Sequence, residues 1–339
     1  MLTALKHTAV AALAAPGIRH LVASSAASSL VIIMMHRFRR ATGDGGHAPE
    51  ALRRILQQLR AARVEIVDAE HALEAFGETA SGMRGASAPR PRVAFTIDDG
   101  YADAVEVAGP VFAEFDVPVT CFVVPQVVDG EDWYWWDKIE TALHRTARDG
   151  FVIEHLGERR TFALRTPQDR RSAFEVLCEW IKRIPADAVP DLLAAMMHAA
   201  DVELPSRAPD SFRVLSWNEM RAAEPKGWRF GAHTMTHPVI GNCTDARADW
   251  EIGASLSAVR EQVTNPTGVF CYPVGREGDF GERDMALMQR HGVSWALSAI
   301  PGRLRPDGPL QKDPRWRWRV PRFAHDERPG GLMRMLLSS

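Results

Sequence analysis

Short apolar runs alternate with amphipathic helical stripes along most of the chain. Residues 29–35 and 92–97 are nearly continuous apolar runs, which is the pattern of strands buried on both faces of a sheet. Between them, Leu52, Ile55 and Leu59 recur at the spacing of one helix face. The strands predicted in this part of the chain are residues 29–35, 63–67, 92–97 and 117–124, and the helices are residues 49–60, 69–76 and 103–114.

This alternation stops at Gly130 and resumes near Arg213. The intervening residues carry an aromatic cluster at 133–136, a hairpin signal at Gly157 and three helical segments, at 137–148, 172–184 and 188–200. We interpret residues 130–211 as a mainly helical insertion that caps the substrate side of the main domain. After it, the predicted strands are residues 228–232, 268–272 and 293–298, and the helices are residues 218–224, 248–263 and 282–291.

Strands that alternate with helices over short connections are typical of parallel βαβ units. We therefore predict an α/β fold in which residues 30–339 form one barrel domain that contains the insertion. Ligands of such folds bind beyond the carboxyl ends of the strands. Residues 1–29 are interpreted as a helix that packs on this domain, and the alternative is a weak signal peptide over residues 1–15.

The composition is that of a soluble globular protein, with 46% hydrophobic and 25% charged residues. Lys and Arg total 41 against 43 acids, so we expect no nucleic-acid partner. No segment has the ~20 consecutive apolar residues that a membrane span requires. The four cysteines lack C-x-x-C spacing and three lie in apolar stretches, so we expect reduced thiols and a cytoplasmic location.

Two carboxylates follow the predicted strand at 92–97. Asp98 and Asp99 are adjacent at its end, where their mutual repulsion requires a cation or a shared proton. The simpler interpretation is an Asp-Gly turn that leaves the strand, since Gly100 follows. This segment alone leaves both interpretations open.

Two of the twelve histidines follow the predicted strand at 228–232. His233 and His237 are four residues apart, and Pro238 disfavours a helix interior, so one turn can present both rings to a metal. Such spacing also arises by chance. Together with one carboxylate of the aspartate pair, two imidazoles would leave coordination positions open, as in catalytic zinc sites, and the second aspartate would be free to act as a base.

With these motifs in order, the chain resembles the polysaccharide deacetylase family, the NodB homology group of carbohydrate esterase family 4. The matching segments are residues 31–38, 95–100, 215–237 and 270–275. The first aspartate motif is similar to Thr-Phe-Asp-Asp-Gly with Ile97 in place of Phe, and the histidine motif is similar to His-Ser/Thr-x-x-His. The resemblance covers residues 30–130 and 213–325 approximately.

The resemblance implies a distorted (β/α)7-type barrel and a hydrolytic metal centre. In it, Asp98 is the catalytic base, Asp99, His233 and His237 bind the metal, and the backbone N–H of Val274 donates to the oxyanion. Thr234 would steady the histidine loop. The metal would be Zn²⁺, although two imidazoles and a carboxylate also suit Co²⁺, Ni²⁺ or Fe²⁺.

Other residues receive roles that the resemblance implies less directly. His325 is the nearest counterpart of the family's histidine that protonates the leaving amine, and a solvated loop is the alternative. Tyr272, Pro273, Trp135 and His36 are predicted to bind substrate. For Tyr272 and Pro273 the alternative is a simple turn at the strand end, and for the aromatic cluster it is an anchor for the insertion. Cys271 stands where many relatives carry an arginine that orients the base, so Arg319, Arg322 or no residue would orient it here.

We therefore expect a metal-dependent hydrolase that removes N-acetyl groups from amino sugars of a polysaccharide, oligosaccharide or glycan precursor and releases acetate. Its partner would be an N-acetylated carbohydrate. Two alternatives stay open: hydrolysis of another non-peptide C–N bond, as in an imide or ureide, and a catalytically inactive protein that binds glycans.

Overall fold

The computed structural model describes residues 29–41, 45–80, 91–305 and 313–328, together with Gly331 and Met335; for residues 79 and 80 only the backbone is described. The helix predicted within residues 1–29 lies outside these ranges, apart from Ser29. None of the helices in the described ranges has the length and apolar character needed to cross a membrane.

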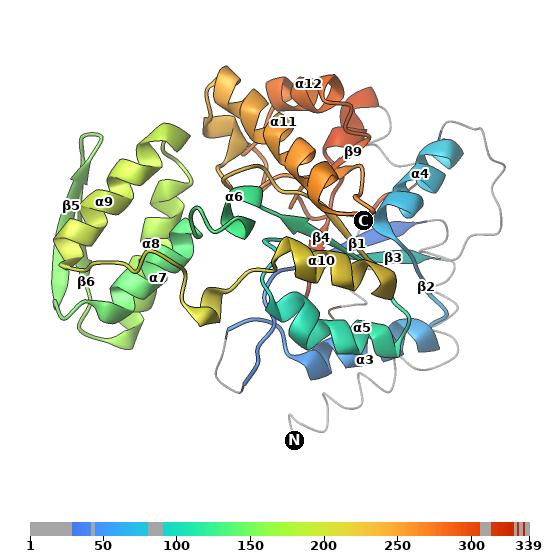
Figure 1. Cartoon of the computed structure of the whole chain (residues 1–339), viewed down its shortest axis with the longest axis horizontal. Coiled ribbons are helices and arrows are strands. Elements are labelled where there is room, and N and C mark those ends of the chain that lie inside the picture. The colour runs from blue at the N-terminus through green and yellow to red at the C-terminus, as the bar shows by residue number, and fades with distance from the viewer. Residues whose placement is uncertain are drawn as a thin grey trace.

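Five parallel strands form the central sheet in the order β10 (Phe323–Ala324), β1 (Leu30–Met35), β3 (Arg92–Ile97), β4 (Val119–Val123) and β7 (Trp228–Ala232). A short strand, β2 (Glu65–Ile66), also pairs with β3. Nearly all residues of β1, β3 and β4 are buried, as their continuous apolar sequences predict. Figure 1 shows this sheet at the centre of the larger part of the molecule.

Two further parallel strands, β8 (Val269–Cys271) and β9 (Trp295–Leu297), continue the sheet into a ring. A parallel bridge between Phe230 and Pro266 joins β7 to the segment that enters β8, and a bridge between Leu297 and Val320 joins β9 to the segment that enters β10. Seven strands thus surround one axis, which confirms the predicted distorted (β/α)7-type barrel.

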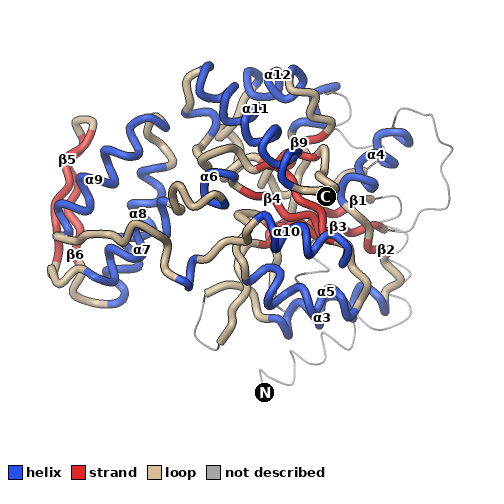
Figure 2. Tube along the Cα trace, in the orientation of Figure 1, coloured by secondary structure: helices blue, strands red, loops and turns tan. Residues whose placement is uncertain are grey.

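Helices cover the outside of this ring (Figures 1 and 2). The apolar stripe of α3 is buried as predicted, at Leu52, Ile55 and Leu59. The helices of the barrel are α3 (Pro49–Ala61), α4 (Ala69–Ala80), the π-helix η1 (Ala104–Ala108) with α5 (Gly109–Glu114), α6 (Pro125–Val128), α10 (Trp217–Ala223), α11 (Asp245–Gln262) and α12 (Glu282–Arg290). Short 3-10 turns are η3 (Asp210–Phe212), η4 (Glu224–Lys226), η5 (Ile240–Asn242) and η7 (Pro314–Trp318).

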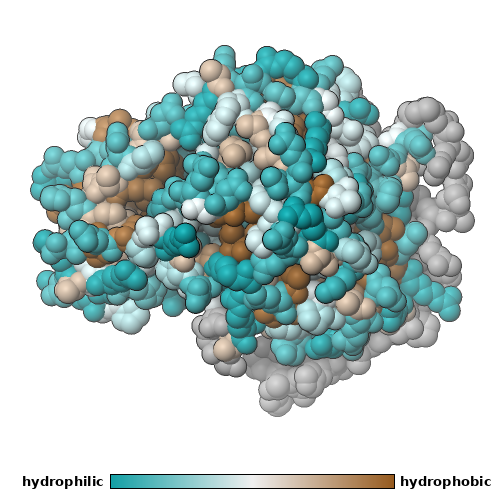
Figure 3. All heavy atoms as spheres, viewed as in Figure 1, coloured by the Kyte–Doolittle hydropathy of each residue, from teal (hydrophilic) through white to brown (hydrophobic). Residues whose placement is uncertain are grey.

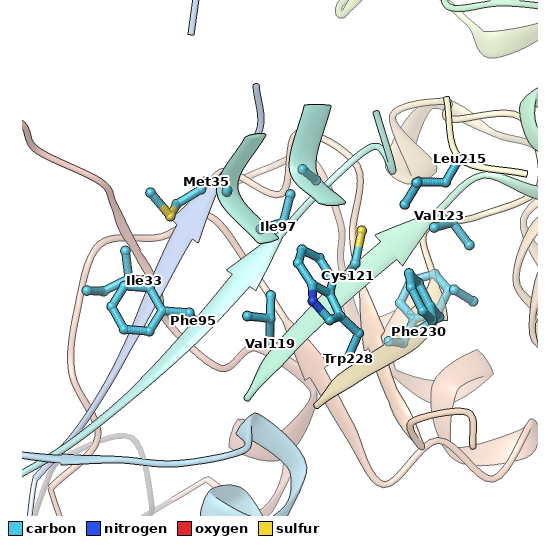
Figure 4. Close-up of a cluster of buried hydrophobic side chains, with 14 of the residues drawn as sticks. Ile33, Met35, Phe95, Ile97, Val119, Cys121, Val123, Leu215, Trp228 and Phe230 are labelled. Atoms are coloured by element: carbon cyan, nitrogen blue, oxygen red, sulfur yellow. The ribbon is translucent and has the colours of Figure 1, made fainter. Parts of the chain in front are cut away.

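Alternate residues of each strand enter two different apolar clusters, because successive side chains of a strand point to opposite faces. Ile33, Phe95 and Cys121 belong to the cluster under α3 and α5, which Figure 4 shows in close-up. Ile32 and Phe122 belong to a second cluster, which contains residues of α4. All four cysteines are buried and free.

The insertion forms a separate unit beside the barrel (Figure 1). It contains the predicted hairpin, β5 (Gly150–His155) with β6 (Glu158–Ala163), and the helices α7 (Trp135–Arg145), α8 (Pro167–Ile181), η2 (Ala186–Ala188) and α9 (Val189–Ala200). These elements enclose their own apolar core, with Ile139, Phe151 and Trp180 fully or almost fully buried. That the unit caps the substrate side stays a prediction.

Candidate active site

The carboxyl ends of the parallel strands converge on one large cavity, as expected for this fold. Its volume is about 1550 Å³. The sequence-predicted residues on its wall are His36, Asp98, Asp99, Trp135, His233, His237 and Val274. These residues come from five separate segments, so the fold brings together positions up to 238 residues apart in the sequence, His36 and Val274.

Asp98 is buried and held by a single guanidinium group. Arg322 donates to both carboxylate oxygens of Asp98, each at 2.8 Å. Arg322 is itself fixed by donating to the carbonyl of Ser298 at 2.8 Å, and it contacts the sulfur of Cys271 at 3.1 Å. Although burial disfavours a charge on Asp98, the pairing with Arg322 holds the pKa of this carboxyl well below its ordinary value. Asp98 is therefore an ionised carboxylate, ready to accept a proton.

This pairing decides which arginine orients the predicted base. Arg322 lies one residue before β10 and reaches Asp98, whereas Arg319 pairs with Glu277 at the surface, at 3.4 Å. Cys271 occupies a buried place beside the Arg322 guanidinium. Of the alternatives that the sequence left open, Arg322 is thus the residue that orients Asp98.

We expect Arg322→Lys to lower kcat about 100-fold, because an ammonium cannot make the two parallel hydrogen bonds and a base displaced by ~1 Å loses about that much. Steady-state kinetics of acetate release would measure this, with Arg319→Lys as the matched control at wild-type rate. A kcat for Arg322→Lys within about twofold of wild type would show that bidentate pairing does not position Asp98.

Asp99, His233 and His237 place three ligand atoms around one point. The Asp99 Oδ1 atom lies 3.6 Å from His233 Nε2 and 3.3 Å from His237 Nε2. Metal–ligand bonds of about 2.1 Å at tetrahedral angles separate neighbouring ligands by about 3.4 Å. All three residues are buried, and Asp99 Oδ1 has no hydrogen-bond partner among the described residues. The donor set and its spacing therefore fit a zinc-type ion.

The surroundings of His233 and Asp99 prepare these two residues to bind a metal. His233 Nδ1 lies 2.8 Å from the carbonyl oxygen of Cys271, so it carries the proton and leaves Nε2 as the free lone pair. Burial lowers the pKa of His233 to about 4, which keeps the imidazole neutral at neutral pH. For Asp99 burial opposes ionisation, but the adjacent His237 imidazole lowers the pKa of this carboxyl below its ordinary value. Asp99 and His233 are thus in the protonation states that metal binding requires.

The loop from His233 to His237 is held in an unusual shape. Thr234 and His237 both have φ of 61°, in the left-handed region. The Thr234 hydroxyl accepts from the His237 N–H at 3.0 Å, which confirms the predicted steadying role. The carboxylate of Glu251 on α11, fully buried, accepts from the N–H groups of Met235 and Thr236 at 2.9 and 2.8 Å. Sequence reasoning missed Glu251, whose only signal was an acid on the buried face of a helix.

Val274 presents a free N–H to the cavity. Its φ of 60° is rare for a β-branched residue and is characteristic of strain kept at a functional position. Gly275 closes the turn by donating to the Pro273 carbonyl at 2.6 Å. Within the described residues, the Val274 N–H has no acceptor, so it is available to a substrate oxygen.

Tyr272 and Pro273, predicted to bind substrate, do not line the cavity. Tyr272 is 1% exposed, stacks on Phe280 at 4.2 Å between ring centroids, and does not line the cavity. Pro273 is also buried and lies off the cavity wall. Tyr272 therefore packs in the core, and the left-handed turn at Val274, with φ of 60°, leaves that residue on the cavity wall.

The structure places His36, and not His325, on the wall of the cavity. His36 lines the cavity, and its Nε2 atom lies 3.9 Å from Asp98 Oδ2. His325 does not line the cavity; its N–H donates to the Met34 carbonyl and its ring meets the edge of His47, with centroids 4.6 Å apart. His325, predicted as general acid, therefore packs on His47 off the cavity wall, whereas His36 lies on that wall near Asp98.

The aromatic cluster anchors the insertion and also contributes to the cavity wall. Trp133 and Tyr134 are buried, and the Tyr134 hydroxyl donates to the Asp99 carbonyl at 2.6 Å, which anchors the insertion at the metal centre. Trp135 lies on the cavity wall as predicted. Trp136 lies there too, stacked on Tyr134 at 4.3 Å and edge-on to His237 at 4.6 Å, and sequence reasoning had not selected it.

A buried carboxyl of the insertion also reaches the cavity. Asp137 accepts from the Tyr101 hydroxyl at 2.6 Å, and that hydroxyl accepts from the Trp136 indole at 2.8 Å. Burial raises the pKa of Asp137 to about 8, so at neutral pH the carboxyl is mostly protonated and can donate as well as accept hydrogen bonds.

Comparison with known proteins places these features in a known fold. Residues 180–294 match the family model described as polysaccharide deacetylase. The chain is similar to the deacetylase PplD from Streptococcus pyogenes, solved in complex with acetate, at 13% identity and a TM-score of 0.57, covering 91% of this chain and 99% of that one. It is also similar to IcaB from Ammonifex degensii, at 15% identity and a TM-score of 0.53, covering 91% and 96%.

The deacetylase domain of BpsB from Bordetella bronchiseptica is a further similar structure, at 13% identity and a TM-score of 0.50, covering 88% of this chain and 98% of that one. At these identities the likenesses show the fold. No curated protein matches the chain significantly.

Proposed function

We propose that this chain, which matches the polysaccharide deacetylase family model over residues 180–294, is a metal-dependent hydrolase that removes N-acetyl groups from amino sugars. One observation carries the proposal: an ionised carboxylate, a three-ligand metal centre and a free backbone N–H line the same cavity. Hydrolysis of an amide requires a base for water, stabilisation of the oxyanion and a proton for the amine.

Asp99, His233 and His237 would hold the ion, which when bound supplies Lewis acidity and lowers the pKa of a bound water towards ~7. Asp98 would accept a proton from the water that attacks the acetyl carbonyl. Arg322 keeps Asp98 ionised. The Arg322 guanidinium cannot itself act as an acid, because the pairing with Asp98 raises its pKa above an ordinary value that is already far above neutral pH. The Val274 N–H would donate to the oxygen on which charge develops.

His36 is the residue placed to protonate the leaving nitrogen. It lies on the cavity wall 3.9 Å from Asp98, and its side chain is 46% exposed, so it can exchange protons with solvent. The C–N bond breaks as the nitrogen takes a proton from His36, the new C–O bond comes from water, and the products are acetate and a free amine. Asp98 then returns its proton to the neutral imidazole directly or through water.

Replacement of His36 tests this assignment. We expect His36→Gln to lower kcat between 10²- and 10⁴-fold with metal content unchanged, and His71→Gln, at an exposed histidine outside the cavity, to have no effect. The loss at His36→Gln should shrink on an acetanilide with an electron-withdrawing ring, because a better leaving group needs less proton donation. An equal loss on both substrates would assign His36 to substrate positioning only.

The cavity is large enough for several sugar rings, and its walls suit a carbohydrate. Trp135 and Trp136 offer aromatic faces to apolar C–H surfaces, and Asp137 offers a hydrogen bond to a hydroxyl. A second cavity of about 480 Å³, between barrel and insertion, shares His237 and Val274 with the first. Figure 3 shows apolar surface on the insertion and in the hollow beside the barrel, within a mostly hydrophilic face.

Acetate release from N-acetylglucosamine oligomers, with zinc and with chelator, tests the proposal. The expected result is acetate and free amine in equal amounts, only with metal. Turnover of cyclic imides or ureides without acetate release would support the alternative C–N hydrolase. Binding of oligomers with neither product would support an inactive glycan-binding protein, against which the presence of Arg322 and His36 at Asp98 argues.

A further inference from the structure

A second group of metal-type ligands lies outside the cavity, where two segments of the chain meet. His47 precedes α3, and His325 and Glu327 follow β10. One ligand atom from each of the three side chains lies within 4.8 Å of the other two. None of these residues lines the cavity of Asp98, so the group is separate from the proposed catalytic centre.

His325 is the member that the polypeptide leaves unsatisfied. The residue is 9% exposed, and neither of its ring nitrogens has a hydrogen-bond partner among the described residues. Buried polar groups normally find a partner, and an imidazole without one costs free energy. The His325 ring meets the edge of the His47 ring, so its unsatisfied nitrogens adjoin the other two ligands.

His47 and Glu327 already have the separation of two ligands on one ion. His47 Nδ1 lies 3.3 Å from Glu327 Oε1, against the ~3.4 Å expected between ligands of a tetrahedral site. The Glu327 carboxylate is oriented by the Ala48 N–H, which donates to Oε1 at 2.8 Å, and by Arg39, whose guanidinium pairs with Oε2 at 3.3 Å. The side chains of His47 and Glu327 are 21% and 29% exposed, which leaves a path from solvent.

We propose that His47, His325 and Glu327 form a second divalent metal site of zinc type. Two imidazoles and one carboxylate are ligands that zinc accepts, with water completing the coordination. The role of this site is structural. The His47 N–H donates to the Arg37 carbonyl at 2.7 Å, and the His325 N–H donates to the Met34 carbonyl at 2.9 Å. An ion that joins His47 to His325 would therefore stabilise residues 34–37, which include His36, from both ends.

Metal analysis of zinc-reconstituted, dialysed protein tests the proposal without any measurement of acetate release. We expect about two equivalents of zinc in the wild-type chain and about one in either His47→Ala or Glu327→Gln. Asp99→Asn should also retain about one equivalent, and Asp99→Asn with Glu327→Gln about none. The matched control is His291→Ala, which removes another histidine paired with a carboxylate, Asp249, and should keep both equivalents.

Thermal unfolding gives a second readout. Zinc should raise the Tm of Asp99→Asn, which lacks the catalytic site, and should no longer do so once Glu327→Gln is added. A wild-type chain that binds one equivalent, or a Glu327→Gln variant that keeps two, would overturn the second site. Because no substrate is used, that outcome would leave the proposed deacetylase function untouched.

Discussion

Asp98→Asn abolishes acetate release, by about 10³-fold or more, while the variant still binds metal. The asparagine side chain keeps the volume of the carboxylate but cannot accept a proton from water. The Arg322 guanidinium, fully buried, then loses its ionised partner, so we also expect a lower Tm. Initial rates, metal content and thermal unfolding of the purified variant would measure the three effects separately.

The control for Asp98→Asn is Asp249→Asn, which removes a half-exposed carboxylate on α11 and should leave the rate unchanged. If Asp98→Asn retained more than about a tenth of the wild-type rate with full metal occupancy, a different group would be the base. If its loss of rate followed a loss of metal, Asp98 would belong to the ligand set.

His237→Ala has the second large effect, because it removes one of only three protein ligands of the catalytic centre. We expect loss of the catalytic metal and of acetate release to the level of chelator-treated wild type. His237 also meets Trp136 edge-on, so the variant changes packing, and Asp99→Asn serves as a second ligand variant that keeps the side-chain volume. Both are measured by metal content and initial rate over a range of added zinc.

The control for these ligand variants is chelation of the wild type followed by zinc. Activity should disappear and return in the wild type, and should return in neither variant. A His237→Ala protein as active as wild type in the presence of chelator would rule out catalysis at this metal centre.

The site residues that the sequence could predict are those that follow the ends of strands. Asp98, Asp99 and His233 directly follow long apolar runs, and parallel strands bring such positions to one side of a barrel. Their side chains are close together for that reason alone, and the resemblance to deacetylases added the roles.

The supporting residues could not be predicted in the same way. Arg322 reaches Asp98 across 224 positions of sequence, and the strand that follows it, β10, is only two residues long, too short to leave an alternating pattern. Glu251 lies in a helix whose sequence gives no reason for a buried acid until the loop above it is known.

His325 and Tyr272 were predicted at the site but lie off the cavity wall, and in both cases the reason is the direction of the side chain. His325 follows a strand end, as a catalytic histidine would, but points to His47. Tyr272 neighbours Val274 in the sequence, yet packs on Phe280 in the core. A shift of one position reverses the face on which a strand side chain lies, and sequence alone gives turns no fixed register.

The most direct test of the central claim is a zinc titration of the apo protein, with acetate and free amine measured from one N-acetylglucosamine oligomer. We predict that both products appear in equal amounts as the centre of Asp99, His233 and His237 fills, and that Asp98→Asn binds zinc in parallel without forming either. Acetate formed at the same rate without zinc, or equally by Asp98→Asn, would contradict the account.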